Sequence, residues 1–143
     1  MNAFLFAFNQ FLFFIFSIVV LHEFGHLIVA KISNYTLEEI SILFVKYDFL
    51  TKKLSFKINI FQNYVRVTPN TEKNILLYFS IGIIINITLG IIFILLRDFN
   101  YIFLITGIQS LFVGFINLIP KWKSDGHFIC MILFPNKFPF DEI

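Results

Sequence analysis

The chain has 143 residues, of which 58% are hydrophobic, 20% aromatic and 14% charged, and its formal net charge is +2. Soluble domains carry about 25% charged residues, and a domain of this size still exposes much of its surface. The 22 phenylalanines therefore argue against a soluble globular protein. A disordered chain would be poor in aromatic residues, and a nucleic-acid-binding domain would be more basic. The composition is that of a membrane protein, and the length fits one domain.

Three apolar stretches cover half of the chain: residues 3–31, 75–96 and 99–120. Their interiors contain one formal charge, Glu23. Because a helix needs about 20 apolar residues to cross a bilayer, we expect three transmembrane helices in a membrane protein that is mainly α-helical. The alternative is a bundle of buried core helices, but too little polar chain is left to cover three of them.

Lysine and arginine concentrate in two segments, residues 31–74 and the tail 121–143, whereas no basic residue precedes Lys31. The connection between the second and third stretches has Arg97 beside Asp98. Positive charge marks the cytoplasmic side of membrane proteins. We therefore expect an integral protein of the cell membrane whose N-terminus is outside and whose C-terminus is cytoplasmic.

The segment 36–69 differs in character from the helices. Residues 41–45, 54–60 and 62–68 are rich in β-branched and aromatic residues, and 54–60 alternates polar with apolar side chains. This alternation is typical of a half-buried strand. We expect two to four short strands in a membrane-associated β-rich segment that lies against the inner surface of the membrane. The whole chain, residues 1–143, is expected to form a single core. The alternative is an irregular linker.

The first stretch contains His22, Glu23 and His26 in the pattern His-Glu-x-x-His. Histidines four positions apart share one face of a helix and can bind one zinc ion, with the glutamate placed to take a proton from water. Ionisable groups in a membrane helix are costly without partners. The pattern predicts a zinc site toward the cytoplasmic end of this helix. The alternative is a polar cluster without a metal, whose hydrogen bonds are made with neighbouring helices.

A catalytic zinc usually has three protein ligands and one open position, so a third ligand must come from elsewhere. Asp98 falls on the outer side in this topology, and Glu72 is better suited to the start of the second helix. Asp125 and His127 follow the third helix at its cytoplasmic end. These two are the stronger candidates.

The chain just before Asp125 contains a helix breaker. Pro120 cannot continue a regular helix interior, and Gly126 allows a tight turn beside the carboxylate. We expect a broken helix that can place Asp125 against the first helix.

These residues resemble the site-2 protease family of intramembrane zinc metallopeptidases. Residues 22–30 look like its first-helix motif, and residues 117–126 look like its Asn-x-x-Pro motif followed by Asp-Gly. Residues 82–86 are similar to its middle-helix motif Gly-Pro-x-x-Asn, with Ile83 where proline is frequent. The resemblance covers nearly the whole chain as a minimal three-helix core.

The resemblance implies a set of metal and catalytic residues: zinc ligands His22, His26 and Asp125, and the general base Glu23. It also implies that Asn86 and Asn117 face the site and support the substrate or the transition state. Asparagines in membrane helices serve equally well as hydrogen-bonding links between helices. His127 stands where the family commonly has a small residue, and it is the rival metal ligand.

The function implied is a zinc metalloendopeptidase that cuts membrane-embedded or membrane-associated peptides near the cytoplasmic face. We expect such a peptide and membrane lipid as partners, and no nucleic acid. The sequence leaves open whether the protein forms a homo-oligomer or binds a membrane partner. The strands are suited to pair with an extended substrate by edge addition. The alternative is a non-catalytic membrane subunit that uses the polar cluster for assembly. A soluble zinc protease is excluded by composition, and no later helix offers the glutamate ligand of another class.

Overall fold

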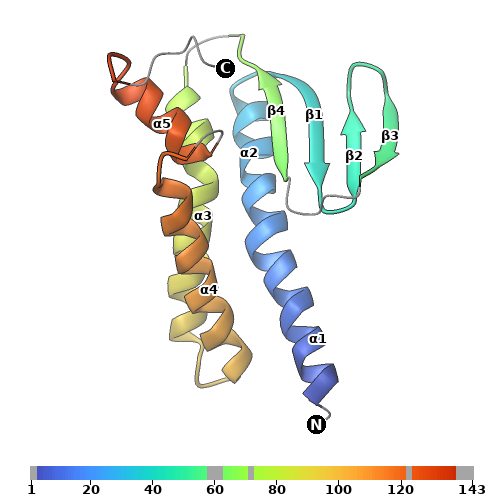
Figure 1. The fold of residues 1–143 in the computed structure, drawn as a ribbon, viewed down its shortest axis with the longest axis vertical. Helices are drawn as coiled ribbons and strands as arrows, with labels where there is room; N and C mark the ends of the chain where they lie inside the picture. Colours follow the sequence, from blue (N-terminus) through green and yellow to red (C-terminus); the bar gives the residue numbers. More distant parts are fainter. Residues whose placement is uncertain (1–2, 58–62, 71–72, 122–123, 138–143) are drawn as a thin grey trace.

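The computed structural model describes residues 3–57, 63–70, 73–121 and 124–137. The fold is mainly helical, with one small antiparallel sheet beside the helices (Figure 1). The helical segments are α1 Ala3–Phe14, η1 Ile15–Val20, α2 Leu21–Ile32, α3 Ile75–Leu95, α4 Tyr101–Leu118 and α5 Asp125–Leu133.

Three helices are long and apolar enough to cross a membrane: Phe4–Ile32, Ile75–Leu95 and Tyr101–Leu118. They agree with the expected stretches to within two residues at each end. Large apolar side chains such as Phe16 and Phe112 are exposed on their outer surfaces. A helix that is apolar all round is typical of a membrane span.

The first span is one continuous rod made of α1, η1 and α2 (Figure 1). Its middle, η1, is a π-helix in which the backbone N–H of Leu21 bonds the carbonyl of Phe16. A π turn takes in an extra residue and so changes which residues share a face. The sequence analysis did not anticipate this turn, which ends at Val20, two residues before His22.

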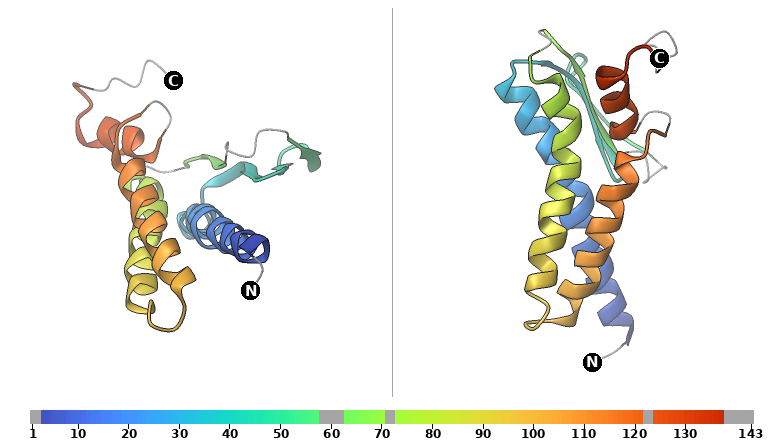
Figure 2. Two further views of the ribbon diagram at one scale, coloured as in Figure 1. Left: turned by 60° about the horizontal axis from the view of Figure 1, so that its bottom comes forward. Right: turned by 90° about the vertical axis from the view of Figure 1, so that its left-hand side faces the viewer.

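The helices α3 and α4 form an antiparallel pair, and α1 packs against them (Figure 2). Polar contacts join the three spans inside this apolar interface. The Gln10 side chain donates to the Thr106 hydroxyl at 2.7 Å, and the Ser110 hydroxyl donates to the backbone carbonyl of Asn86 at 2.8 Å. Such interhelical hydrogen bonds stabilise packing where burial of apolar surface does not favour it.

The β-rich segment forms a four-stranded antiparallel sheet in the order β3-β2-β1-β4. Its strands are β1 Thr36–Ile42, β2 Val45–Asp48, β3 Lys53–Phe56 and β4 Tyr64–Thr68. The expectation of two to four strands is confirmed. The strand expected over 41–45 is wrong in its bounds, because the turn between β1 and β2 falls there and Leu43 has a φ of 53°. Residues 58–62, which belong to two further expected strands, lie outside the described residues.

One face of the sheet packs against α2 and the start of α3. Val29, Ala30, Tyr35 and Tyr78 form a buried cluster, and Leu37 and Val67 of the sheet pack against it. The strands β1 and β4 therefore lie alongside the second half of the first span (Figure 1). This packing places the edge strand β4 next to the histidine motif.

The chain breaks after α4, as Pro120 predicts, and resumes as α5. The hydroxyl of Ser124 accepts the backbone N–H of His127 and caps the new helix. The Phe79 and Phe128 rings stack at 4.6 Å and hold α5 against α3. The tight-turn role expected for Gly126 is wrong, because this glycine lies inside α5 and has no positive φ.

Candidate metal centre

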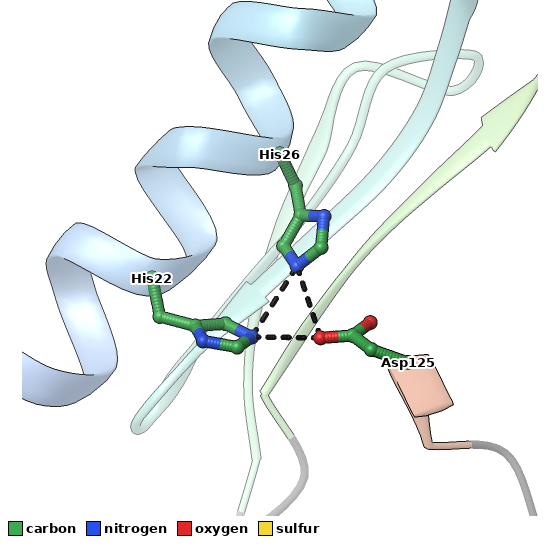
Figure 3. Close-up of side chains that lie close together, drawn as sticks. All are labelled: His22, His26 and Asp125. Carbon is green, nitrogen blue, oxygen red and sulfur yellow. Dashed lines mark hydrogen bonds and ion pairs between the residues drawn. The ribbon is translucent and has the colours of Figure 1, made fainter. Parts of the chain in front are cut away.

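The two motif histidines and Asp125 meet in space. His22 and His26 lie one turn apart on α2, and Asp125 is the first residue of α5 (Figure 3). The Asp125 Oδ2 atom lies 3.1 Å from His22 Nε2 and 3.5 Å from His26 Nε2, and the two Nε2 atoms are 3.3 Å apart. Helical periodicity aligns the histidines, and the break after α4 supplies the carboxylate.

This triangle has the dimensions of three corners of a zinc site. Zinc binds imidazole nitrogen and carboxylate oxygen at about 2.0–2.2 Å in tetrahedral geometry, which separates neighbouring ligand atoms by about 3.3 Å. The three observed separations bracket this value. The donor set of two imidazoles and one carboxylate also suits zinc, so the residues present fit one ion with a further position open.

The second nitrogen of His26 is held by the backbone. His26 Nδ1 lies 2.7 Å from the carbonyl oxygen of Tyr78. Because a carbonyl only accepts hydrogen bonds, Nδ1 carries the proton and Nε2 presents its lone pair to the centre of the triangle. Tyr78 itself is fixed by its hydroxyl, which donates to the backbone carbonyl of Val65 in β4.

His22 packs against the same face of α3. Its Nδ1 lies 3.0 Å from Nδ2 of Asn86. A Cβ added to Gly82 would lie 2.5 Å from His22 Nε2 and 2.7 Å from Nδ1, so the ring occupies the space that a side chain at position 82 would need. Tyr78, Gly82 and Asn86 follow one another at four-residue spacing and so line one stripe of α3.

The carboxylate of Asp125 is positioned by close backbone packing. A Cβ on Gly126 would lie 2.6 Å from the carbonyl oxygen of Asn117 at the end of α4. As a metal ligand this carboxylate would bind in its ionised form.

A cavity of about 340 Å³ opens onto this group. Glu23 and Asn117 line it together with the three possible ligands and Asn86. The Glu23 side chain is 6% exposed and Asn86 is fully buried. The sequence-predicted site residues thus share one cavity, whose other wall includes Tyr64 of β4.

The other candidates for a third ligand lie elsewhere. Asp98 sits in the turn between α3 and α4, with its side chain 89% exposed beside Arg97. His127 is in α5 with its ring edge-on to Phe128, and the group of possible ligands found among the described residues does not include it. Glu72 lies outside the described residues.

The sequence analysis did not name Tyr78, and it gave Gly82 a place in a motif but no role in the site. Tyr78 supplies the carbonyl for His26, and Gly82 supplies the space for His22. The sequence feature that could have indicated Tyr78 is its spacing. It lies four residues before Gly82 and so on the helix face that carries the middle-helix motif. A backbone carbonyl has no residue signature, so this role of Tyr78 was invisible.

Three apolar helices and a His-His-Asp group with two buried histidines define the class as a membrane-associated protein with a candidate metal centre. Residues 10–103 match the model of peptidase family M50, the site-2 protease family, and the chain belongs to this family of membrane zinc metalloproteases. The match includes both histidines, Glu23 and residues 82–86, and it ends before Asp125. Neither the curated proteins nor the solved structures gave a significant match.

Proposed function

We propose that this protein is an intramembrane zinc endopeptidase that hydrolyses peptide bonds of membrane-embedded or membrane-associated peptides near the cytoplasmic face. The observation that carries the proposal is the triangle of His22, His26 and Asp125 ligand atoms, with sides of 3.1–3.5 Å. Membership of peptidase family M50 supports it.

The roles follow from the chemistry of the side chains. Zinc at this site would lower the pKa of water and polarise the peptide carbonyl. Glu23 lies between the two histidines in the sequence of the helix and lines the cavity, which supports a role in accepting a proton from the attacking water and returning it to the leaving amine. Asn117 lines the same cavity and is available to hydrogen-bond the substrate.

The substrate is a peptide that must be extended to be cut, since a helix hides its peptide bonds inside its own hydrogen bonds. The strand β4 is at the edge of the sheet, and its residues Tyr64 and Val65 line the cavity. An extended peptide added along β4 would run past Glu23 and the ligand triangle. This supports edge pairing as the mode of substrate binding.

We propose that the protein lies in the cell membrane with its N-terminus outside and its C-terminus in the cytoplasm, because the lysines and arginines gather between the first two spans and after the third. The Lys31 end of the first span and the start of α5 are then cytoplasmic. His26, five residues before Lys31, lies within the membrane close to that side.

The central test compares the wild-type protein with Glu23→Gln in liposomes that contain synthetic transmembrane peptides. Loss of the general base should lower cleavage by about 10²–10⁴-fold, while zinc content stays near one per chain. The matched control is Glu38→Gln, the same chemical change in β1 outside the cavity. Products are identified by mass spectrometry.

Equal cleavage by the wild type and Glu23→Gln would contradict the assignment. A wild-type protein that binds no zinc would favour the alternative, a non-catalytic membrane subunit. A comparison of membrane peptides in cells with active protein and with Glu23→Gln then identifies the substrate.

A further inference from the structure

The His22 ring sits in a recess of α3 that two residues shape. Gly82 lies under the ring, where an added Cβ would be 2.5–2.7 Å from the ring nitrogens. Asn86, one turn further along α3 and fully buried, has its carboxamide 3.0 Å from His22 Nδ1. The recess therefore fixes both the place of the ring and the hydrogen-bond partner of its Nδ1 atom.

The hydrogen bonding of Asn86 is incomplete in either orientation of its amide. With Nδ2 next to His22 Nδ1, the Oδ1 atom has no hydrogen-bond partner among the described residues. A buried polar atom without a partner costs about 1–3 kcal/mol, and this holds for the amide atom turned away from His22 in either orientation. Rotation by 180° about the Cβ–Cγ bond exchanges Oδ1 and Nδ2, which occupy nearly the same volume.

The two orientations have opposite consequences for His22. If Nδ2 donates to Nδ1, the proton of a neutral ring must reside on Nε2, where it points at Asp125 Oδ2, 3.1 Å away. A protonated Nε2 has no lone pair for a metal. If Oδ1 accepts a proton from Nδ1–H, Nε2 presents its lone pair beside that of His26, and the freed Nδ2 becomes a buried donor at the cavity wall.

We infer that Asn86 is a positioning residue for His22: with its amide oxygen toward the ring it holds the Nδ1–H form and aims Nε2 at the metal, while Gly82 provides the room for the ring. This rests on the proposed function, and it assigns Asn86 a role on the metal ligand, apart from the substrate. This role also explains the Gly-x-x-x-Asn spacing. Residues four apart lie on the same face of α3, so Gly82 can contact the face of the His22 ring while Asn86 contacts its edge.

The anchoring of the Asn86 backbone supports this role. The Ser110 hydroxyl of α4 donates to the Asn86 carbonyl at 2.8 Å, and it is fully buried. This bond ties the helix turn that carries the amide to the neighbouring span. His26 has an analogous arrangement, with the Tyr78 carbonyl in place of the amide oxygen. Both ligands thus take their orientation from the same stripe of α3.

The experiment measures zinc affinity of the full chain in detergent by competition with a chromophoric chelator. Asn86→Leu, similar in volume but without an acceptor, should weaken zinc binding by about 10- to 100-fold. Asn86→Asp keeps an acceptor for Nδ1–H and should restore affinity to near the wild-type value. Gln109→Leu is the matched control, because Gln109 is an amide of α4 outside the cavity, and it should leave zinc affinity unchanged.

A second pair of variants tests the recess. Gly82→Ala should displace the His22 ring and weaken zinc binding by a similar factor. The control is Gly90→Ala, two turns further along the same helix. Its new Cβ would lie 2.6 Å from the Leu111 side chain and would strain helix packing without touching His22. It should lower thermal stability but keep zinc affinity.

Nitrogen NMR of the zinc-loaded protein, with histidine labelled at both ring nitrogens, gives a readout independent of turnover. The wild type should show a protonated Nδ1 for His22, and Asn86→Leu should lose its hydrogen-bonded shift. Wild-type zinc affinity in Asn86→Leu, or equal losses in Asn86→Leu and Asn86→Asp, would overturn the inference. If the wild type itself bound no zinc, the proposed function would fail instead.

Discussion

Glycine at two positions decides the geometry of the candidate metal centre, and in both cases the reason is contact distance. Gly82 leaves room for an imidazole, and Gly126 lets the first turn of α5 lie against the carbonyl groups that end α4. Since Asp125 is covalently next to Gly126, the position of the carboxylate depends on this contact. A side chain there must push α5 away from α4.

Replacement of Gly126 tests this dependence. In Gly126→Ala the new Cβ would lie 2.5 Å from the Leu118 carbonyl carbon and 2.6 Å from the Asn117 oxygen, so α5 must shift and carry Asp125 away from the histidines. We expect zinc affinity to fall on the order of 10- to 100-fold, measured by chelator competition. The control is Gly114→Ala in α4, whose nearest contact is a side-chain carbon of Ile87 at 3.0 Å. Unchanged affinity in Gly126→Ala would show that Asp125 does not bind the metal.

At the scale of the elements, the hairpin of β2 and β3 extends the sheet beyond the helices. Val45 faces Phe56 and Tyr47 faces Leu54 across this hairpin, and the two pairs share one face. Val45, Leu54 and Phe56 are 41%, 62% and 81% exposed. The same face packs against α2 further along the sheet through Val67, so its exposed part continues the apolar surface of the first span.

We expect this apolar face to contact lipid, with the turn after β2 nearer the water. That turn lies at the same end of the molecule as the end of α2 (Figure 1) and contains Lys52. In a Trp122→Phe background, the fluorescence of Phe56→Trp should be strongly quenched by lipids with brominated acyl chains. The control Lys52→Trp should be quenched far less. Equally weak quenching of both would place the hairpin outside the bilayer.

At the scale of the whole molecule, the orientation of the three spans across the membrane decides the side from which a substrate reaches the site. The charge distribution predicts this orientation. The helices α2 and α5, which carry the ligand group, lie toward the end of the molecule opposite the α3–α4 turn (Figures 1 and 2). A cytoplasmic site therefore requires that Asp98, in the α3–α4 turn, faces outside.

Cysteine labelling tests this orientation. In a Cys130→Ser background, a membrane-impermeant maleimide should label Asp98→Cys in intact cells and Lys52→Cys only after the membrane is opened. The reverse pattern would invert the topology and move the site to the outer side. Both positions are exposed, so a difference in labelling reports the side of the membrane.

The sequence by itself determined the helices and the histidine motif. Bilayer thickness sets the length of an apolar span, and helical periodicity puts His22 and His26 on one face, so local pattern was sufficient. The tertiary structure decided that Asp125, rather than His127, lies beside the histidines, and that Tyr78, Gly82 and Asn86 hold them. These contacts join residues 52 to about 100 positions apart along the chain. Their distances depend on how α2, α3 and α5 pack, which no local sequence pattern encodes.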